Sequence, residues 1–555
     1  MILTLLVWLY SLFLCYVYGH LFFKSLRTAP PASPLVVVTG LVTLTTLASF
    51  FSLFLEIGLW FNLLILVGAL AATLTRSVPM LRIQRPFALA PLIVLILALL
   101  LLLENATHNT INPDTNIYHA QAIRWIESFP AVPGLGNLHG RLAFNSAWFV
   151  SNAIFSLPFL GLGSFHLTAG VLFLAVICYF WGGFAEILRG EYTPAALLKV
   201  LFFPLAFSLL GAEISSPGTD LPISLLLWLM AVLWAEADQP QRPLLITLLA
   251  AFIVTVKLSA APALLLAGVA LFSLEKPLAR ETQSSQRFKE GFLSALRVSV
   301  VPALVCGIVI LIPFLIRNII LSGYLLYPVP SINLFSFDWK VPLDRVTGEQ
   351  MSVLAWGRFP RLDAAKVLAM PLDEWLPKWF AAQTANRRLM LSVALLSPLL
   401  ALPGLQLTRR YWLGWLAFFI GTLFWLLSAP DFRFGQGFLI GTILLALAPW
   451  ASAFLQRFAL PAARVTQTIS VLVSLYLGLA LATSFENRTF SSRVLLPLPY
   501  DHVSTQTCDL VNGQVFCAKA YNACSYDAFP CIPSPRPKVE LRNPNSLRDG
   551  FRTVP

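Results

Sequence analysis

A short polar stretch interrupts a chain that is otherwise rich in apolar residues, and it carries side chains that could do chemistry. The stretch NPDTNIYHAQAIRWIE occupies residues 112–127 and follows the apolar run LIVLILALLLLLE. It contains Asp114, Tyr118 and His119. An aspartate can act as a general base toward a hydroxyl group, and a tyrosine or histidine beside it can orient a substrate. A plainer interpretation makes Asp114 only the N-cap of the helix that follows.

Three cations stand at the edges of apolar runs elsewhere in the chain. Lys257 lies in FIVTVKLSAAPALLLAG, Arg317 in IPFLIRNIILSGYLLYPVP and Arg433 in SAPDFRFGQGF. A charge close to hydrocarbon is costly, so each is either a side chain that snorkels to the interface or part of a functional site. Three cations that meet beside carboxylates would suit a negatively charged lipid headgroup. The remaining candidates, for orienting a substrate, come from the same polar stretches: Asp220, Asn318, His139 and Arg141.

The composition indicates which elements must hold these residues. Of the 555 residues, 57% are hydrophobic and 12% charged, and the mean hydropathy is +0.76. Such a chain has too few charges to cover a soluble globule of its size. Apolar stretches of about 17 to 23 residues recur along it, and a helix of that length crosses a hydrocarbon core roughly 30 Å thick. The sequence therefore predicts an all-α polytopic membrane protein.

About fourteen transmembrane helices are expected, with amphipathic helices in the two longest connections. The expected spans lie near residues 1–23, 34–55, 57–74, 87–104, 164–188, 194–212, 220–236, 242–256, 259–273, 298–320, 391–404, 411–428, 434–454 and 466–484. The connections 104–147 and 321–390 have the pattern of helices that lie on the bilayer surface. We divide the chain into N-terminal transmembrane helices (1–86), a transmembrane core (87–484) and a tail (485–555).

The Lys and Arg residues in short loops predict the orientation of the chain. The basic connections all fall on one face, which is expected to be cytoplasmic: 24–33, 75–86, 274–297, 405–410 and 455–465. The opposite face then carries Asp114, Lys257, Arg317, Arg433 and the tail. We expect a plasma or inner membrane protein with these residues on the external or periplasmic side. The net charge of +12 reflects the basic loops rather than nucleic-acid binding.

Four of the seven cysteines gather in the polar tail: Cys508, Cys517, Cys524 and Cys531. In an exported segment they predict two disulfides, with the pairing left open, followed by a weakly ordered end. Zinc is the rival, but no CxxC pair occurs and only His502 is near. The chain also lacks a P-loop, a GxGxxG or GxSxG motif and an internal repeat. We therefore expect no cofactor, and a divalent metal is not supported.

The motifs resemble, in the same order, those of the GT-C superfamily of integral membrane glycosyltransferases, and within it the protein mannosyltransferase and lipid A aminoarabinose transferase group. D-T-N-I-Y, with Asp114 and Tyr118, is similar to the D-E-x-x-Y motif of that group, although Thr115 replaces the second acidic residue. SPGTDLPI, VTVKLSA and RNIILSGYLLYP resemble three further motifs, and Arg433 with Phe434 resembles a fourth. The resemblance covers residues 87–440. VPGLGNLHGRLAFNSAWF also resembles a segment of an uncharacterised bacterial family of polytopic membrane proteins.

The resemblance implies a transferase that moves a sugar from a polyprenyl phosphate to a hydroxyl group of a lipid, glycan or protein acceptor. Asp114 would be the general base. The departing phosphate would be stabilised by three cations: Lys257, Arg317 and Arg433. The sugar or the acceptor would be oriented by Tyr118, His119, Asp220, Asn318, His139 and Arg141. The alternative is a transporter or flippase of an anionic lipid or lipid-linked sugar, which would need ionisable residues near the middle of its spans, where this chain has few.

Overall fold

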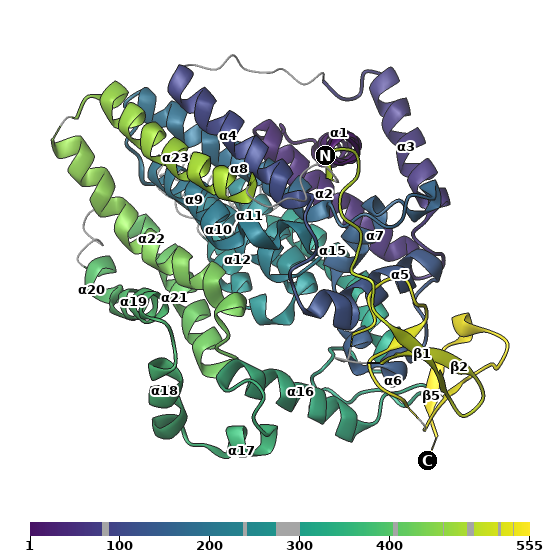
Figure 1. Cartoon of the computed structure of the whole chain (residues 1–555). Coiled ribbons are helices and arrows are strands. Elements are labelled where there is room, and N and C mark those ends of the chain that lie inside the picture. The colour runs from purple at the N-terminus through teal and green to yellow at the C-terminus, as the bar shows by residue number, and fades with distance from the viewer. Residues whose placement is uncertain are drawn as a thin grey trace, which may run out of the picture.

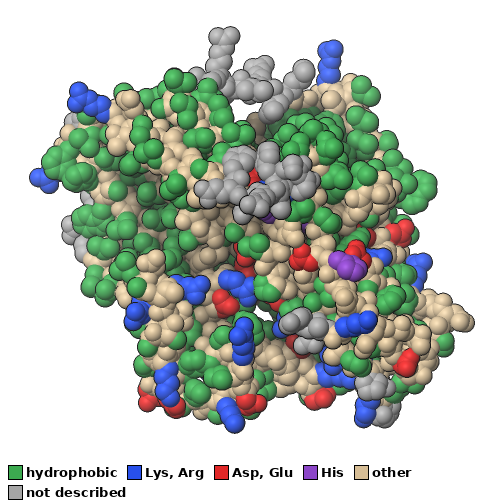
Figure 2. Space-filling model, in the orientation of Figure 1, with side chains coloured by type: hydrophobic (Ala, Val, Ile, Leu, Met, Phe, Trp, Pro, Cys, Tyr) green, Lys and Arg blue, Asp and Glu red, His purple; other side chains and the backbone are tan. Residues whose placement is uncertain are grey.

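The computed structural model describes residues 1–79, 88–236, 241–272, 300–402, 409–458, 460–485, 493–519, 523–536 and 538–554. Within these ranges the chain forms a bundle of apolar helices, and loops, short helices and a small β-structure gather at one end of it (Figure 1). Figure 2 shows that Lys, Arg, Asp and Glu side chains collect mainly at that end, which we call the polar end. The predicted helical membrane class is confirmed, and the described part of the tail adds five short strands.

Nine helices in the described ranges are long and apolar enough to cross a membrane. They are α1 (Ile2–Ser25), α2 (Ser33–Phe51), α4 (Leu89–Ala106), α8 (Thr168–Leu188), α9 (Pro194–Leu210) with the 3-10 turn η4 (Gly211–Ser215), α15 (Val301–Ser322), α21 (Arg409–Ser428), α22 (Phe432–Arg457) and α23 (Ala462–Phe485). The predicted count of about fourteen spans is therefore not met. The other predicted positions hold shorter helices: α3 (Leu59–Leu74), α10 (Asp220–Ala235), α11 (Arg242–Val256), α12 (Ala263–Phe272), α19 (Ala385–Leu396) and α20 (Pro398–Ala401).

Helix α10 shows why apolar composition overstated the number of long spans. Every residue of α10 and of α11 is buried, so their apolar character serves packing inside the protein. Trp228 of α10 stacks on Phe202 of α9 with ring centroids 5.2 Å apart, and its ring nitrogen donates to the carbonyl of Gly437 in α22 at 3.2 Å. A side chain at Gly437 would meet Leu227 at 2.7 Å. This close packing holds α10 against α22, the two helices whose first turns carry Asp220 and Arg433.

The first long connection contains the predicted helix, but not where we expected it. Residues Thr115–His119 form a single π-helical turn (η1), which continues into α5 (Ala120–Ser128). Two short elements, α6 (Leu135–Leu138) and η2 (Gly140–Ala143), lead to α7 (Ala147–Phe155). The expectation that this helix lies on the bilayer surface is wrong, because α7 packs against it and the tail covers it. Gln121 and Trp125 are only 1% and 2% exposed.

The second long connection forms the predicted amphipathic helices: α16 (Leu343–Arg358), α17 (Ala364–Ala369) and α18 (Leu372–Ala381). Trp375 and Trp379 of α18 are buried in a cluster with Trp425 and Phe432, which come from α21 and α22. Leu372, on the same helix, is exposed. This segment therefore braces the ends of α21 and α22 next to Arg433.

The tail contains both predicted disulfides, Cys508–Cys517 and Cys524–Cys531, and their pairing excludes zinc binding by these thiols. Strand β1 (Thr505–Asp509) pairs antiparallel with β2 (Gln514–Ala518), which pairs parallel with β3 (Cys531–Ile532). Strand β4 (Val539–Leu541) pairs antiparallel with β5 (Phe551–Thr553). The expected weakly ordered end is wrong, because Phe551 of β5 is fully buried against Trp125 of α5, with ring centroids 6.0 Å apart.

Two basic residues place the predicted cytoplasmic connections away from the polar end. Lys24 lies in the last turn of α1. At the other end of this helix, the amino group of the N-cap residue Met1 donates to the carbonyl of Arg493, beside the end of α4. Arg457 ends α22, whose first turn carries Arg433. Parts of the predicted basic loops lie outside the described residues, including Arg82 and Arg85, the stretch 274–297 and residues 405–408.

Candidate functional site

Asp114 pairs with cations and does not cap a helix through its side chain. It occupies the N-cap position of η1, yet its carboxylate makes no capping hydrogen bond. Instead Arg141 Nη1 donates to Asp114 Oδ1 at 3.0 Å, and Arg433 Nη1 lies 3.8 Å from Oδ2. The Asp114 side chain is 25% exposed, so a ligand can reach its carboxylate. The interpretation of Asp114 as a simple N-cap therefore does not describe its contacts.

Arg433 stands in the first turn of α22, where Asp431 anchors it. The backbone N–H of Arg433 donates to Asp431 Oδ1 at 3.1 Å, and Arg433 Nε lies 3.6 Å from Asp431 Oδ2. Trp425 of α21 in turn donates to the Asp431 carbonyl at 2.7 Å. Direct charge-assisted hydrogen bonds are shorter, about 2.7–2.9 Å. Because its two ion pairs are longer than that and its side chain is 30% exposed, Arg433 has room to take up another anion.

Lys257 and Asp220 form a tighter pair in the same place. Lys257 follows the last turn of α11 and Asp220 begins α10, and their charged atoms lie 2.6 Å apart. The Lys257 ammonium also lies 3.6 Å from the centre of the Phe434 ring, and the guanidinium of Arg433 is 5.5 Å from the same ring. Phe434 therefore links the two cations by cation–π contacts.

Asn112 and Glu213 lie beside these residues, and neither was predicted from the sequence as a site residue. Asn112 donates to Glu213 of η4 at 3.1 Å and accepts a bond from the backbone N–H of Asp114 at 3.0 Å. The Ser216 hydroxyl accepts from the backbone N–H groups of Ile111 and Asn112 at 3.0 and 3.1 Å. The turn after α9 thereby fixes the chain just before Asp114. The available signal was Glu213 itself, an acid in a short connection on the predicted side of Asp220.

Tyr118 and His119 lie beside Asp114 on η1. The Tyr118 ring packs edge-on against those of His119 and Phe144, at 4.4 and 5.9 Å, and the Arg141 guanidinium lies 5.7 Å from its centre. Burial lowers the pKa of His119 to about 4. Asp114 acts in the opposite direction, and the nearby cations lower this pKa further. The imidazole is therefore neutral near pH 7. Its Nδ1 is buried and has no hydrogen-bond partner within the described ranges.

Three predicted site residues are buried and make no hydrogen bond or ion pair with Asp114, Lys257 or Arg433 in the described ranges. Arg317, on α15, is buried and donates to Asn145 Oδ1 at 3.1 Å and to Ser52 Oγ at 2.7 Å, both neutral partners. The side-chain nitrogen of Asn318 is buried and has no partner among the residues described. His139 is buried near Arg141, and burial lowers the pKa of His139 to about 3. Their roles in binding or orienting a substrate remain predictions.

Four carboxylates and three cations thus converge from four parts of the chain. We call them the site group: Asp114, Arg141, Glu213, Asp220, Lys257, Asp431 and Arg433. Because the charges nearly balance, the group can stay partly exposed without a ligand, and an anionic ligand would share the cations with the carboxylates. In the part of the chain that the structure describes, no set of three or more His, Cys, Asp or Glu side chains could hold a metal ion.

A comparison with protein families places this site in a wider context. Residues 1–440 match a family described as a domain of unknown function, DUF8201. The chain belongs to this family. The DUF8201 segment includes every member of the site group, since Arg433 is the last of them, and the disulfide-bonded tail lies beyond it. No curated protein and no solved structure matches the chain.

Proposed function

We propose that this protein is an integral membrane glycosyltransferase of the GT-C type, which moves a sugar from a polyprenyl-phosphate donor to an acceptor hydroxyl. One observation carries the proposal. Asp114 and the cations of α11 and α22 lie together, partly exposed, at one end of an apolar helical bundle. A lipid-linked donor needs cations at the membrane boundary for its phosphate, and a hydroxyl acceptor needs a base beside them.

Asp114 is the proposed general base. Its carboxylate takes the proton of the acceptor hydroxyl while that oxygen bonds to the anomeric carbon and the bond from this carbon to the phosphate breaks. Arg141 holds one carboxylate oxygen at 3.0 Å, which fixes the direction of the carboxylate. The bond breaking leaves negative charge on the polyprenyl phosphate. Cations fixed near that phosphate therefore stabilise the transition state more than the bound substrate.

Arg433 and Lys257 are the proposed ligands of the phosphate. The ion pairs of Arg433, at 3.6 and 3.8 Å, are long enough for a phosphate oxygen to become its closest partner. Asp220 keeps Lys257 in place at 2.6 Å. Tyr118 and His119 orient the sugar or the acceptor. Arg317, Asn318 and His139 have supporting roles in this proposal. Arg317 bonds to Asn145. The preceding residue in the sequence, Phe144, contacts the Tyr118 ring.

The proposal locates the reaction at the external or periplasmic face of a plasma or inner membrane. It is supported by the basic ends of α1 and α22, which lie away from the polar end. The acceptor is a hydroxyl group on a lipid, glycan or protein. No nucleotide site is needed, because the donor sugar is already activated by its bond to the lipid phosphate.

A transporter or flippase has less support. Buried charges do occur inside the bundle: Lys199 pairs with Glu186 at 2.5 Å and with Glu236 at 2.6 Å. They lie near the ends of α8, α9 and α10 that are far from Asp220, since Glu236 follows the last residue of α10 and Asp220 is its first. These charges therefore do not continue the site group into the middle of the bundle, as a transport path would require.

The proposal is tested with purified protein in lipid vesicles. A panel of radiolabelled polyprenyl-phosphate sugars is added together with lipid and glycan acceptors. We expect one donor to lose its sugar to an acceptor. Movement of intact donor across the vesicle membrane, with no cleavage of the sugar–phosphate bond for any member of the panel, would support the transporter instead.

A further inference from the structure

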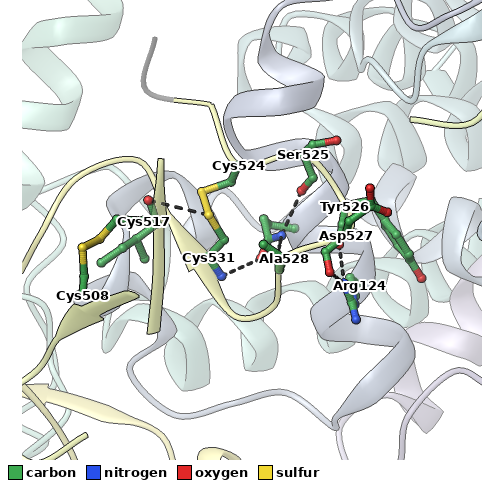
Figure 3. The surroundings of a disulfide bond; sticks show 11 residues. Arg124, Cys508, Cys517, Cys524, Ser525, Tyr526, Asp527, Ala528 and Cys531 are labelled. Carbon is green, nitrogen blue, oxygen red and sulfur yellow. Dashed lines mark hydrogen bonds between the residues drawn. A yellow bond between two sulfur atoms is a disulfide. The ribbon is translucent and has the colours of Figure 1, made fainter. Parts of the chain in front are cut away.

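Gln121 joins the candidate active site to the disulfide-bonded tail. It lies on α5 directly after the turn that carries Tyr118 and His119, and its side chain is 1% exposed. Its side-chain nitrogen donates to the carbonyls of Ser525 and Ala528 at 2.8 and 2.7 Å, and its oxygen accepts from the backbone N–H of Cys531 at 3.0 Å. Three hydrogen bonds of one buried side chain thus go to a single loop. The disulfide Cys524–Cys531 joins the two ends of this loop (Figure 3).

The same loop also bonds to the backbone inside the η1 turn. The Asn116 carbonyl accepts from the backbone N–H groups of Cys524 and Ser525, at 2.6 and 3.0 Å. The Asn116 side chain donates to Asp501 of the tail at 3.0 Å. Asn116 stands between Asp114 and Tyr118 in the sequence, so these bonds are made within the segment that carries the proposed base.

A third anchor lies one helical turn further along α5. Arg124 donates to the carbonyls of Tyr526 and Asp527, and its guanidinium lies 5.0 and 4.8 Å from the ring centres of Tyr526 and Phe529. Figure 3 shows Arg124 reaching from its helix to the loop. The Tyr526 hydroxyl donates to Glu127 at 2.5 Å. The loop therefore holds both ends of the segment from Asn116 to Glu127.

The segment needs such support. Isolated helices shorter than about 12–15 residues are marginal in water, and α5 has 9 residues. A π-helical turn is an uncommon element that is frequent at functional sites, and it adds no length of regular helix. A covalent link between Cys524 and Cys531 keeps the loop closed, so that its bonds to Asn116 and to Gln121 form together.

We propose that the loop Cys524–Cys531, with Gln121 as its main anchor, is the positioning element that holds Asp114, Tyr118 and His119 in their working geometry. The effect of this element on a reaction rate rests on the proposed glycosyltransferase function. Its effect on the order of the segment does not. Lys257 follows α11 and Arg433 lies on α22, so both are outside the segment that the loop holds.

Hydrogen–deuterium exchange of the full-length protein tests the positioning role without any substrate. In the variant Cys524→Ser/Cys531→Ser, amides of residues 114–121 should exchange faster by about tenfold or more. Without the disulfide the loop is no longer held closed, so its hydrogen bonds to this segment open more easily. The matched control is Cys508→Ser/Cys517→Ser, which opens the disulfide between β1 and β2 and should leave this exchange unchanged. Unchanged exchange in the first variant, or an equal increase in both, would overturn the proposal.

Gln121→Leu provides a second route that leaves both disulfides intact. It removes the three hydrogen bonds while keeping a buried side chain of similar size, and it should also speed exchange in residues 114–121. Gln121→Glu retains the acceptor for Cys531 and should give a smaller increase than Gln121→Leu. Protection equal to that of the wild type in Gln121→Leu would contradict the role of Gln121.

A kinetic measurement separates positioning from general loss of structure. With a donor that the wild type uses, Gln121→Leu should lower kcat roughly tenfold and change the KM for the donor less than about twofold. A rise in the donor KM with unchanged kcat would contradict positioning of the base. If the wild type transfers sugar from no donor, the proposed function fails, while the exchange experiment still decides whether the loop orders the segment.

Discussion

Asp114 and Arg433 face each other across 3.8 Å, although one precedes a π-helical turn after α4 and the other begins α22. Each of the two side chains also has a second partner. Arg141 bonds to Asp114, and Asp431 caps the helix that carries Arg433. The pair is thus built from two independently anchored halves, which an anionic ligand could join without moving either backbone.

Replacement of Asp114 tests the proposed base. Asp114→Asn keeps an oxygen that can accept from Arg141 but removes the basic carboxylate. We expect sugar transfer to fall by roughly 10²–10⁴-fold, while binding of the donor changes little. The measurement is the rate of transfer alongside donor binding. A suitable control is Asp363→Asn, since Asp363 caps α17 and has no contact with the site group. Wild-type transfer by Asp114→Asn would rule out this residue as the base.

Replacement of Arg433 tests the phosphate site. Arg433→Ala should raise the KM for the donor by roughly 10–100-fold, in line with the loss of about 1.5–3 kcal/mol for a hydrogen bond to a charged group. Arg433→Lys should keep part of the affinity for the donor, because the lysine ammonium still supplies a point charge. Arg387→Ala is the matched control, because Arg387 stacks on Phe432, 5.1 Å from its ring centre, without an ion pair to Asp114. Equal effects of Arg433→Ala and Arg387→Ala would argue against a phosphate contact.

The Lys257–Asp220 pair should contribute to folding as well as to binding. Asp220 is 9% exposed, so Lys257→Met would leave a nearly buried carboxylate without its cation. We expect a loss of roughly 2–3 kcal/mol, below the range for fully buried pairs because Lys257 is partly exposed. Thermal unfolding in detergent measures it. The double variant Lys257→Met/Asp220→Asn should recover much of the lost stability, and a double variant no more stable than the single one would contradict this account.

Two histidines should make the folded state sensitive to acid. The pKa of His119 is lowered to about 4 and that of His139 to about 3 by burial, whereas an unfolded chain binds the proton near a pKa of about 6.5. The unfolded state therefore takes up protons first, and stability falls as the pH drops from about 6.5 toward 4, by about 1.4 kcal/mol per pH unit for each histidine. Above about pH 7 both histidines are neutral in the folded and in the unfolded state, so they no longer change the stability.

Melting temperatures at about pH 7 and pH 5 measure this dependence in wild type and in His119→Gln. The variant should lose less stability on acidification, by about 2 kcal/mol at pH 5, since one of the two protonation sites is gone. Identical losses in the two proteins would show that His119 is not held neutral by the fold.

Much of the helical architecture could be predicted, because an apolar run long enough to span a membrane has few other folds available. Helices occur near all of the predicted positions. The number of long spans was overestimated, because helices such as α10 and α11 are apolar all round for packing inside the protein, and composition does not separate this from contact with lipid. The strands of the tail were not predicted, because two to five residues carry little periodic signal and depend on the disulfides and on α5 for their position.

The meeting of Asp114, Lys257 and Arg433 could be expected from the alternation of spans, which assigns all three to one side. The pairing within the group could not. Arg141 was selected from a glycine-rich segment without a known partner, and its bond to Asp114 depends on the fold of η2. Arg317 also stands at the edge of an apolar run, but it lies inside α15, where its buried side chain bonds to Asn145 and Ser52.

The central claim is that Asp114 and Arg433 form one binding site for a lipid phosphate on one side of the membrane. Single cysteines at these positions, Asp114→Cys and Arg433→Cys, can be labelled in sealed vesicles with a membrane-impermeant thiol reagent, before and after addition of polyprenyl phosphate. The account predicts that both react from the same, non-cytoplasmic side and that polyprenyl phosphate slows both reactions. Labelling from opposite sides, or labelling that polyprenyl phosphate leaves unchanged at both positions, would contradict it.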